Sequence, residues 1–317
     1  MHFYFKNPVA LILYKAIYGS FPKTAVYVKQ DRFNRGKPRD IHFYKVEESR
    51  MENSTNICKK FSINLEIIDW NSFTKLQGIC FESSLINDKN QENSDIIFQT
   101  SDVYTVIGFS NYINFPYTKL KLNLYWKSRI DTEVVNSIYI YNPNKLPVPN
   151  VNFKAINLDY VRNNFKEISD FMLPHLFKKS ELYLNNDEQY ILALPPANLR
   201  KSDFRKRFMG EVLEIANSLK QQIILKPHRN DLYDYREYID SENIVKCNYD
   251  EFKYFEVEYL FGCNNINKII AYPSSALVFA DYSKQLILVP QNRDLFRRHL
   301  TDQLVFFQYS GLDYKRI

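Results

Sequence analysis

Short apolar runs separated by amphipathic segments define the second half of the chain. Runs of aliphatic residues with the length and composition of buried strands occur at 190–194, 222–225, 268–271 and 285–289. Between the first two, apolar residues recur on one helical face at Phe204, Phe208, Val212, Ile215 and Leu219. Ser202 or Asp203 is placed to cap that helix. Strands that alternate with helices predict a parallel, doubly wound sheet.

The pattern continues less regularly on either side of that region. Further helices are expected at 158–171, at 255–262 and after Ser275, and a short strand at 243–246. In the first half, residues 7–19 have helical spacing, with Pro8 in the first turn and Gly19 near the end. The polar stretch 87–94 is expected to be a surface loop. Runs rich in β-branched and aromatic residues predict strands at 25–28, 41–44, 65–68, 95–98 and 137–141.

A proline-rich segment divides the chain. Residues 142–150 contain three prolines, which disfavour regular structure and stiffen a connection. A chain of 317 residues is long enough for two cores. We therefore expect two domains, 1–150 and 151–317.

Composition narrows the class of protein. The chain is 45% hydrophobic and 25% charged, which is typical of a globular protein. Its net charge of +6 suits an anionic donor, an acidic polysaccharide or an anionic membrane face, and no nucleic-acid-binding signature accompanies it. The 4 cysteines lack CxxC or metal-ligand spacing, so no metal site and no disulfide framework is expected. The apolar segment 8–14 is too short to span a bilayer. These features predict a cytoplasmic protein, with peripheral contact to the inner membrane left open.

Candidate chemistry follows two of the predicted strands. Lys226, His228 and Arg229 come directly after one strand, and Ser274 and Ser275 come after another. Ligands of open α/β sheets bind at the carboxyl ends of strands, and cations, an imidazole and hydroxyl groups there suit a phosphate. The plainer alternatives are a basic loop that covers the sheet and serines that cap a helix.

A carboxylate could complete a nucleotide site. Glu258 stands at the start of a predicted helix, where it could accept hydrogen bonds from ribose hydroxyls, and Glu256 competes for that role. A solvated carboxylate on the helix surface is the plainer alternative for both.

The order of these motifs resembles the C-terminal half of bacterial sialyltransferases and polysialyltransferases. The similarity covers about 190–289 and rests on Lys-Pro-His after a strand, an acidic helix start and Ser-Ser-Ala after a later strand. It extends to capsule-type transferases of related acidic sugars such as Kdo and other nonulosonic acids. The resemblance implies an α/β, GT-B-like fold, in which two Rossmann-like domains face a central cleft. The N-terminal domain would bind the acceptor and the C-terminal domain the nucleotide-sugar donor.

The resemblance also assigns roles to the candidate residues. His228 would contact the phosphate of a CMP-sugar and assist its departure as a general acid, near Lys226 and Arg229. Ser274 and Ser275 would hold the phosphate or the sugar carboxylate, and Glu258 the ribose. The donor is a substrate, so no cofactor and no metal ion is implied. The acceptor would be an oligosaccharide or a lipid-linked glycan.

Two features depart from the family pattern. The family has proline after the histidine, where this chain has Arg229, and the first half lacks an acidic-acidic-Gly motif that would supply the catalytic base. An inverting transfer needs a carboxylate to deprotonate the acceptor hydroxyl. Asp102 and Asp203 are the candidate bases.

Two alternatives stay open. The segment 274–282 is also similar to the serine-pair region of CDP-glycerol glycerophosphotransferases of polymer synthesis, which have a GT-B fold and a histidine near the donor phosphate. A catalytically degenerate glycan-binding or assembly subunit would also lack the base motif.

Overall fold

A computed structural model of the chain describes residues 2–29, 39–69, 76–81, 91–97, 135–140, 153–196, 202–229, 231, 233, 235–290 and 314–317. The chain forms two compact units, one of Met1–Asn164 and one of Phe165–Leu300 with Leu312–Ile317. The proline-rich segment 142–150, expected to link two domains, lies outside the described residues.

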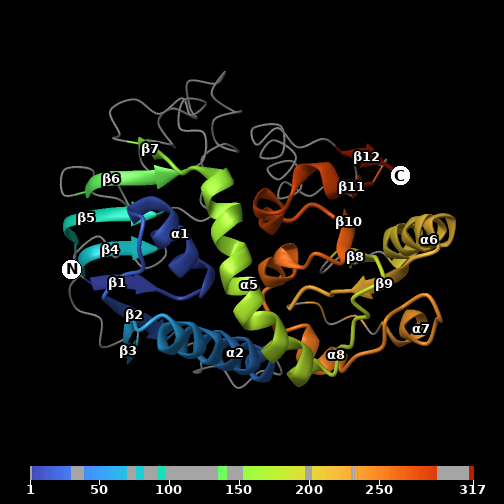
Figure 1. Cartoon of the computed structure of the whole chain (residues 1–317), viewed down its shortest axis with the longest axis horizontal. Coiled ribbons are helices and arrows are strands. Elements are labelled where there is room, and N and C mark those ends of the chain that lie inside the picture. The colour runs from blue at the N-terminus through green and yellow to red at the C-terminus, as the bar shows by residue number, and fades with distance from the viewer. Residues whose placement is uncertain are drawn as a thin grey trace. The chain divides into compact units, whose positions relative to one another are not determined.

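The first unit contains a seven-stranded sheet in the order β3-β2-β1-β4-β5-β6-β7 (Figure 1). Every neighbouring pair is parallel. Its strands are β1 (His2–Phe5), β2 (Thr24–Lys29), β3 (Asn64–Asp69), β4 (Leu76–Phe81), β5 (Gln91–Ile97), β6 (Val135–Ile140) and β7 (Phe153–Ala155). Parallel neighbours need crossover connections, and helices α1 (Val9–Tyr18) and α2 (Arg39–Lys60) supply the first two.

Helix α1 lies within the predicted span 7–19 but begins two residues later, at Val9. Pro8 precedes it with φ −58°, the value its ring imposes, and Gly19 ends it with φ +78°. Because only glycine adopts that left-handed conformation readily, the chain can turn there toward β2. The first half of α1, from Val9 to Leu13, is fully buried.

Other expectations for the first unit were wrong. The apolar run 41–44 lies within α2 and not in a strand, because a 22-residue helix overrides the local preference of a few β-prone residues. Strand β5 already begins at Gln91, inside the stretch 87–94 expected to be a loop. Strands β1 and β4 were missed, since runs of 4 and 6 residues are too short to show a clear periodicity.

The second unit contains a five-stranded parallel sheet in the order β12-β11-β10-β8-β9. Counted from its first strand, this is the doubly wound order 2-1-3-4-5. The predicted strands at 190–194, 222–225, 268–271 and 285–289 are confirmed. The strands are β8 (Tyr190–Leu194), β9 (Gln222–Leu225), β10 (Ile266–Ala271), β11 (Gln285–Val289) and β12 (Lys315–Arg316).

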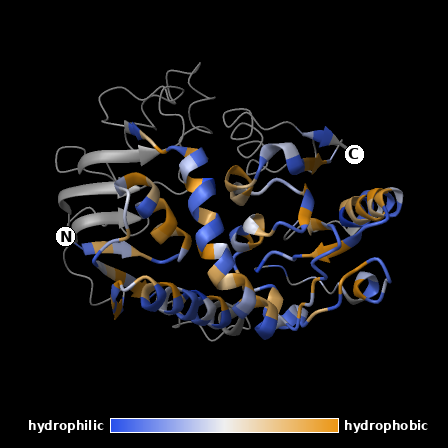
Figure 2. Ribbon diagram, in the orientation of Figure 1, coloured by the Kyte–Doolittle hydropathy of each residue, from blue (hydrophilic) through white to orange (hydrophobic). Residues whose placement is uncertain are grey.

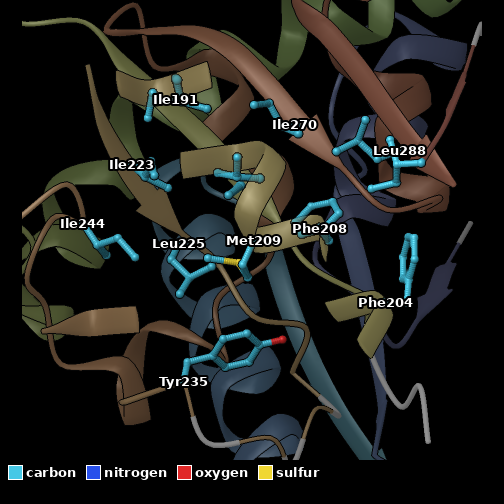
Figure 3. Packing of buried hydrophobic residues seen from close by; sticks show 14 residues of the cluster. Ile191, Phe204, Phe208, Met209, Ile223, Leu225, Tyr235, Ile244, Ile270 and Leu288 are labelled. Atoms are coloured by element: carbon cyan, nitrogen blue, oxygen red, sulfur yellow. The ribbon is translucent and has the colours of Figure 1, made fainter. Parts of the chain in front are cut away.

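The second sheet is buried on both faces, as parallel sheets generally are. One face packs against helix α6 (Ser202–Leu219), whose apolar and polar residues alternate along the ribbon (Figure 2). Phe204, Phe208 and Met209 of this helix join Leu225 and Ile270 in one buried cluster (Figure 3). The opposite set of strand residues is also buried: Leu192, Ile224, Ile269 and Ile287. The predicted helical face is confirmed at Phe204, Phe208 and Val212, which are buried. Ile215 is only partly buried, and Leu219 at the end of the helix is 44% exposed.

Helix α5 (Leu158–Ser180) is longer than predicted and continues through Pro174. In the second unit it contacts two short 3₁₀ helices, η4 (Val257–Gly262) and η5 (Ser275–Phe279). Phe165 and Phe279 lie with ring centroids 5.2 Å apart. An added Cβ at Gly262 would lie 2.5 Å from Cβ and Oγ of Ser169. The helix predicted at 255–262 is thus the shorter 3₁₀ helix η4, which packs against α5.

The remaining segments of the second unit are short. The predicted strand at 243–246 is a single bridge between Ile223 and Ile244. The helix expected after Ser275 is the five-residue η5. The other short helices are α7 (Arg236–Ile239), α8 (Tyr249–Phe252) and η6 (Tyr282–Lys284). The protein is a mixed α/β protein built on parallel sheets.

Candidate phosphate-binding site at the edge of the second sheet

The basic segment after β9 and the serine pair after β10 leave the second sheet on opposite sides of β8. The backbone N–H of Lys226, after β9, donates to the carbonyl of Ala193 at 2.9 Å. The backbone N–H of Tyr272, after β10, donates to the neighbouring carbonyl of Leu194, also at 2.9 Å. The last of these backbone hydrogen bonds on each side of β8 therefore lie at its carboxyl end, at the adjacent residues Ala193 and Leu194.

This location is the switch point of the doubly wound sheet. The connection after β8 leads to β9 on one side, whereas β10 pairs with β8 on the other side. Ligands of such sheets bind outside the carboxyl ends of the strands at this point. Neighbouring strands are about 4.8 Å apart, so β9 and β10 are separated by about 10 Å. A ligand of nucleotide size can span that separation.

Lys226 is directed into the protein at this edge. Its side chain is buried, and Nζ donates to the carbonyls of Lys253 at 2.9 Å and Pro227 at 3.2 Å. Burial lowers the pKa of Lys226 to about 7, and the attraction of Glu256 opposes this shift. The ammonium thus fixes the segment before η4 to the end of β9.

Arg229 is paired with one of the two candidate glutamates. Its Nη1 donates to both carboxylate oxygens of Glu256, at 2.8 and 2.9 Å. Glu256 is buried, and the Arg229 side chain is 24% exposed. The pair neutralises one of the two cations that the sequence places after β9. Glu256 is therefore occupied with Arg229, which distinguishes it from Glu258.

Glu258 lies in the first turn of η4 and is partly exposed. Desolvation raises the pKa of Glu258 to about 7, and the negative charge of Glu256 adds to the rise. Arg229 and Lys226 act in the opposite direction, so both lie within electrostatic reach. Near neutral pH this carboxyl group exists in both protonation states and can donate as well as accept a hydrogen bond.

His228 is exposed between the buried Lys226 and the partly exposed Arg229. The backbone N–H of Asp231 donates to the His228 carbonyl at 2.8 Å and closes a turn. The structure therefore presents the imidazole at the sheet edge while the neighbouring Lys226 and Arg229 hold the chain on both sides.

Ser274 and Ser275 follow β10 on the other side of β8. Ser274 precedes η5 in extended conformation, with φ −137° and ψ 139°, and its partly exposed side chain makes no capping hydrogen bond to the helix. Its carbonyl accepts the N–H of Leu277 at 3.2 Å. Ser275 is the first residue of η5, and its side chain lies outside the described residues. Since η5 is a short 3₁₀ helix, its dipole contributes little.

The two candidate bases differ in what the structure describes. Asp203 lies exposed in the first turn of α6, the helix that follows β8, and so is at the same sheet edge. Asp102 lies outside the described residues. The assignment of a base stays a prediction.

Sequence reasoning missed a buried polar group beside the His228 turn. Arg205 and Asp231 are both buried, and Arg205 Nη2 lies 3.4 Å from Asp231 Oδ1. The rings of Tyr233 and Tyr235 pack on the Arg205 guanidinium, with centroids 4.0 and 5.7 Å from Cζ. Asp231 follows His228 closely in sequence, but no spacing rule pairs it with a residue on an earlier helix.

In the described part of the chain, no group of three or more His, Cys, Asp or Glu side chains could hold a metal ion. None of the helices in the same ranges is both long enough and apolar enough to cross a bilayer.

Comparisons with known proteins add no assignment. No protein-family model matches the chain, and no curated protein matches it.

Proposed function

We propose that the chain is a glycosyltransferase that moves an acidic sugar from a CMP-activated donor to a surface-glycan acceptor. The sugar would be sialic acid, Kdo or another nonulosonic acid, transferred with inversion and without a metal ion. The observation that carries this proposal is the placement of His228 and Ser274 on the two sides of β8 at the switch point of a doubly wound sheet.

The contacts at this edge refine the proposed roles. His228 and Ser274 are the exposed or partly exposed groups, so in the proposal they contact the donor phosphate directly. Lys226 and Arg229 shape the site, since both donate to protein acceptors. Glu258 binds the ribose hydroxyls, because Glu256 already accepts from Arg229. His228, as imidazolium, would protonate the departing phosphate, and a carboxylate would take the acceptor proton.

A GT-B enzyme, with the acceptor bound by the first unit and the donor by the second, is the finer form of this proposal. The all-parallel sheets of both units support it, since each is compatible with a Rossmann-like domain. Two alternatives share the site: a CDP-glycerol glycerophosphotransferase-like enzyme and a glycan-binding subunit without turnover.

A thermal-shift titration with CMP, CDP, UDP and GDP tests the donor class. A ligand that binds only the folded state stabilises it by about 2.7 kcal/mol at a hundredfold excess over its dissociation constant. We expect CMP to stabilise the wild type and to stabilise His228→Ala and Ser274→Ala much less. Gln222→Ala and Asn267→Ala are the matched controls, because these exposed residues lie at the opposite ends of β9 and β10.

The outcomes separate the alternatives. Preference for CDP would favour the glycerophosphotransferase. CMP binding without release of CMP from CMP-sialic acid or CMP-Kdo, with an acidic glycan acceptor present, would favour the binding subunit. Preference for UDP or GDP, or no stabilisation by any nucleotide, would contradict the proposed site.

A further inference from the structure

The turn that presents His228 is attached to a buried ion pair. Asp231 closes this turn through its backbone N–H, and its carboxylate lies inside the protein. Oδ1 accepts the backbone N–H of Tyr233 at 3.1 Å, and Oδ2 accepts the hydroxyl of Tyr235 at 2.7 Å. Asp231 thus holds the His228 turn through its backbone and the residues that follow the turn through its side chain.

Arg205 connects this turn to a different part of the sheet edge. Its Nη2 lies 3.4 Å from Asp231 Oδ1 and 3.2 Å from the carbonyl of Pro196, just after β8. Tyr233 packs on the guanidinium plane with its ring centroid 4.0 Å from Cζ. Arg205 therefore joins the segment after β8, the first turns of α6 and the loop after β9.

Buried ion pairs contribute little net stability, because desolvation offsets much of their attraction. Their better-supported contribution is to fix one arrangement among several. Here the arrangement that is fixed includes the backbone of His228 at the switch point. We infer that Arg205 and Asp231 are positioning residues that hold the His228 turn against the end of β8, ready for an anionic ligand. The ligand part of this inference rests on the proposed function.

Amide hydrogen exchange at position 231 tests the positioning role without any ligand. The double variant Arg205→Met/Asp231→Asn removes both charges together, so no unpaired charge is left buried, and Asn keeps an acceptor for Tyr233. We expect exchange of the amide at position 231 to become about tenfold faster, while the amides of Leu192 and Ile224 keep their wild-type rates. Unchanged exchange at position 231, or equal acceleration at Leu192 and Ile224, would overturn the inference.

An exposed ion pair of the same unit serves as the control. Lys253 and Asp250 have the same 3.4 Å separation as Arg205 and Asp231, but the Asp250 side chain is 87% exposed. The variant Lys253→Met/Asp250→Asn is expected to leave exchange at position 231 unchanged. Acceleration there as large as in Arg205→Met/Asp231→Asn would also overturn the inference.

CMP affinity, measured by titration calorimetry, tests whether the pair acts through His228. We expect Arg205→Met/Asp231→Asn to raise the dissociation constant about as much as His228→Ala does. Adding His228→Ala to the double variant is expected to change it by less than about twofold, because residues that act as a unit are not additive. If the effects of the double variant and of His228→Ala on the dissociation constant multiply, the positioning role is wrong. If the wild type binds no CMP, the proposed function fails, whereas the exchange measurement still decides the positioning role.

Discussion

Arg229 binds both carboxylate oxygens of Glu256, so the charge that the sequence places nearest the imidazole of His228 is already paired. The consequence is a sheet edge with less net positive charge than its sequence indicates. Lys226, Arg229 and Glu256 together carry one positive charge when Lys226 is protonated, and ionised Glu258 cancels that charge.

Removing the charge of Glu256 should therefore change stability and anion affinity in opposite directions. Glu256→Gln keeps the size of the side chain but weakens a charged hydrogen bond, so we expect the free energy of unfolding to fall by about 1–3 kcal/mol. Arg229 then lacks its counter-charge, and we expect CMP to bind more tightly. Denaturant unfolding and calorimetric titration measure the two effects.

The matched control is Glu242→Gln, since Glu242 is exposed in the same unit. It is expected to change neither quantity. Weaker CMP binding in Glu256→Gln, at unchanged stability, would show that Glu256 and not Glu258 contacts the ligand.

Lys226 and Glu258 should give the stability a minimum near pH 7. The pKa of Glu258 is raised from 4.5 to about 7, so the folded state binds more protons than the unfolded state between these values, and this group's contribution falls as pH rises. The pKa of Lys226 is lowered from 10.5 to about 7, so the unfolded state binds more protons above pH 7, and stability rises with pH.

Unfolding free energies measured from pH 5 to pH 10 test each group separately. Glu258→Gln should remove the decrease below pH 7, and Lys226→Met should remove the increase above it. A pH profile that neither substitution alters would contradict the assigned shifts. The variants are compared by the slope of the unfolding free energy against pH. A change in packing shifts the free energy at every pH but does not change this slope.

Gly262 should not tolerate a side chain. A Cβ at this position would lie 2.5 Å from Cβ and Oγ of Ser169 and 3.4 Å from the Cα of Lys166. Because these atoms belong to helix α5, we expect Gly262→Ala to lower the free energy of unfolding by about 1–3 kcal/mol. Chemical denaturation provides the measurement.

The second-site variant Ser169→Gly removes both clashing atoms. We expect Gly262→Ala/Ser169→Gly to be more stable than Gly262→Ala, despite the cost of about 1 kcal/mol for glycine within a helix. Gly210→Ala is the control, since nothing lies within 4 Å of a Cβ there. Destabilisation of Gly262→Ala that Ser169→Gly does not relieve would refute the close approach of η4 to α5.

The Tyr235 hydroxyl should contribute to the stability of the second unit. It donates to Asp231 Oδ2 at 2.7 Å in a buried setting. Tyr235→Phe keeps the ring in the core but removes this charged hydrogen bond, so we expect a loss of about 1.5–3 kcal/mol. Tyr183→Phe is the control, because Tyr183 is 80% exposed. Equal stability of the two variants in a urea titration would contradict the buried hydrogen bond.

The sequence alone predicts the type of fold and most strands of the second unit, although β10 begins two residues before the predicted 268–271 and β12 has no counterpart among the predicted strands. Aliphatic runs such as Tyr190–Leu194 are buried on both faces, and burial on both faces requires continuous hydrophobicity whatever the neighbouring strands are. The helix boundaries near Pro8 and Gly19 were also predictable. The proline ring and the absence of a Cβ in glycine each determine the backbone conformation of their own residue, whatever the rest of the fold is. Because ligand sites follow strand ends, Lys226, His228 and Ser274 could be singled out from the same pattern.

Which of these side chains contact one another depends on how the chain folds. The pairing of Arg229 with Glu256 and of Arg205 with Asp231 joins residues 27 and 26 positions apart, on segments whose separation follows no period. The same holds for residues 41–44, which resemble a strand locally but lie in α2. Strand runs are set by local burial, whereas ion pairs and helix extent depend on the segments that the fold places beside them.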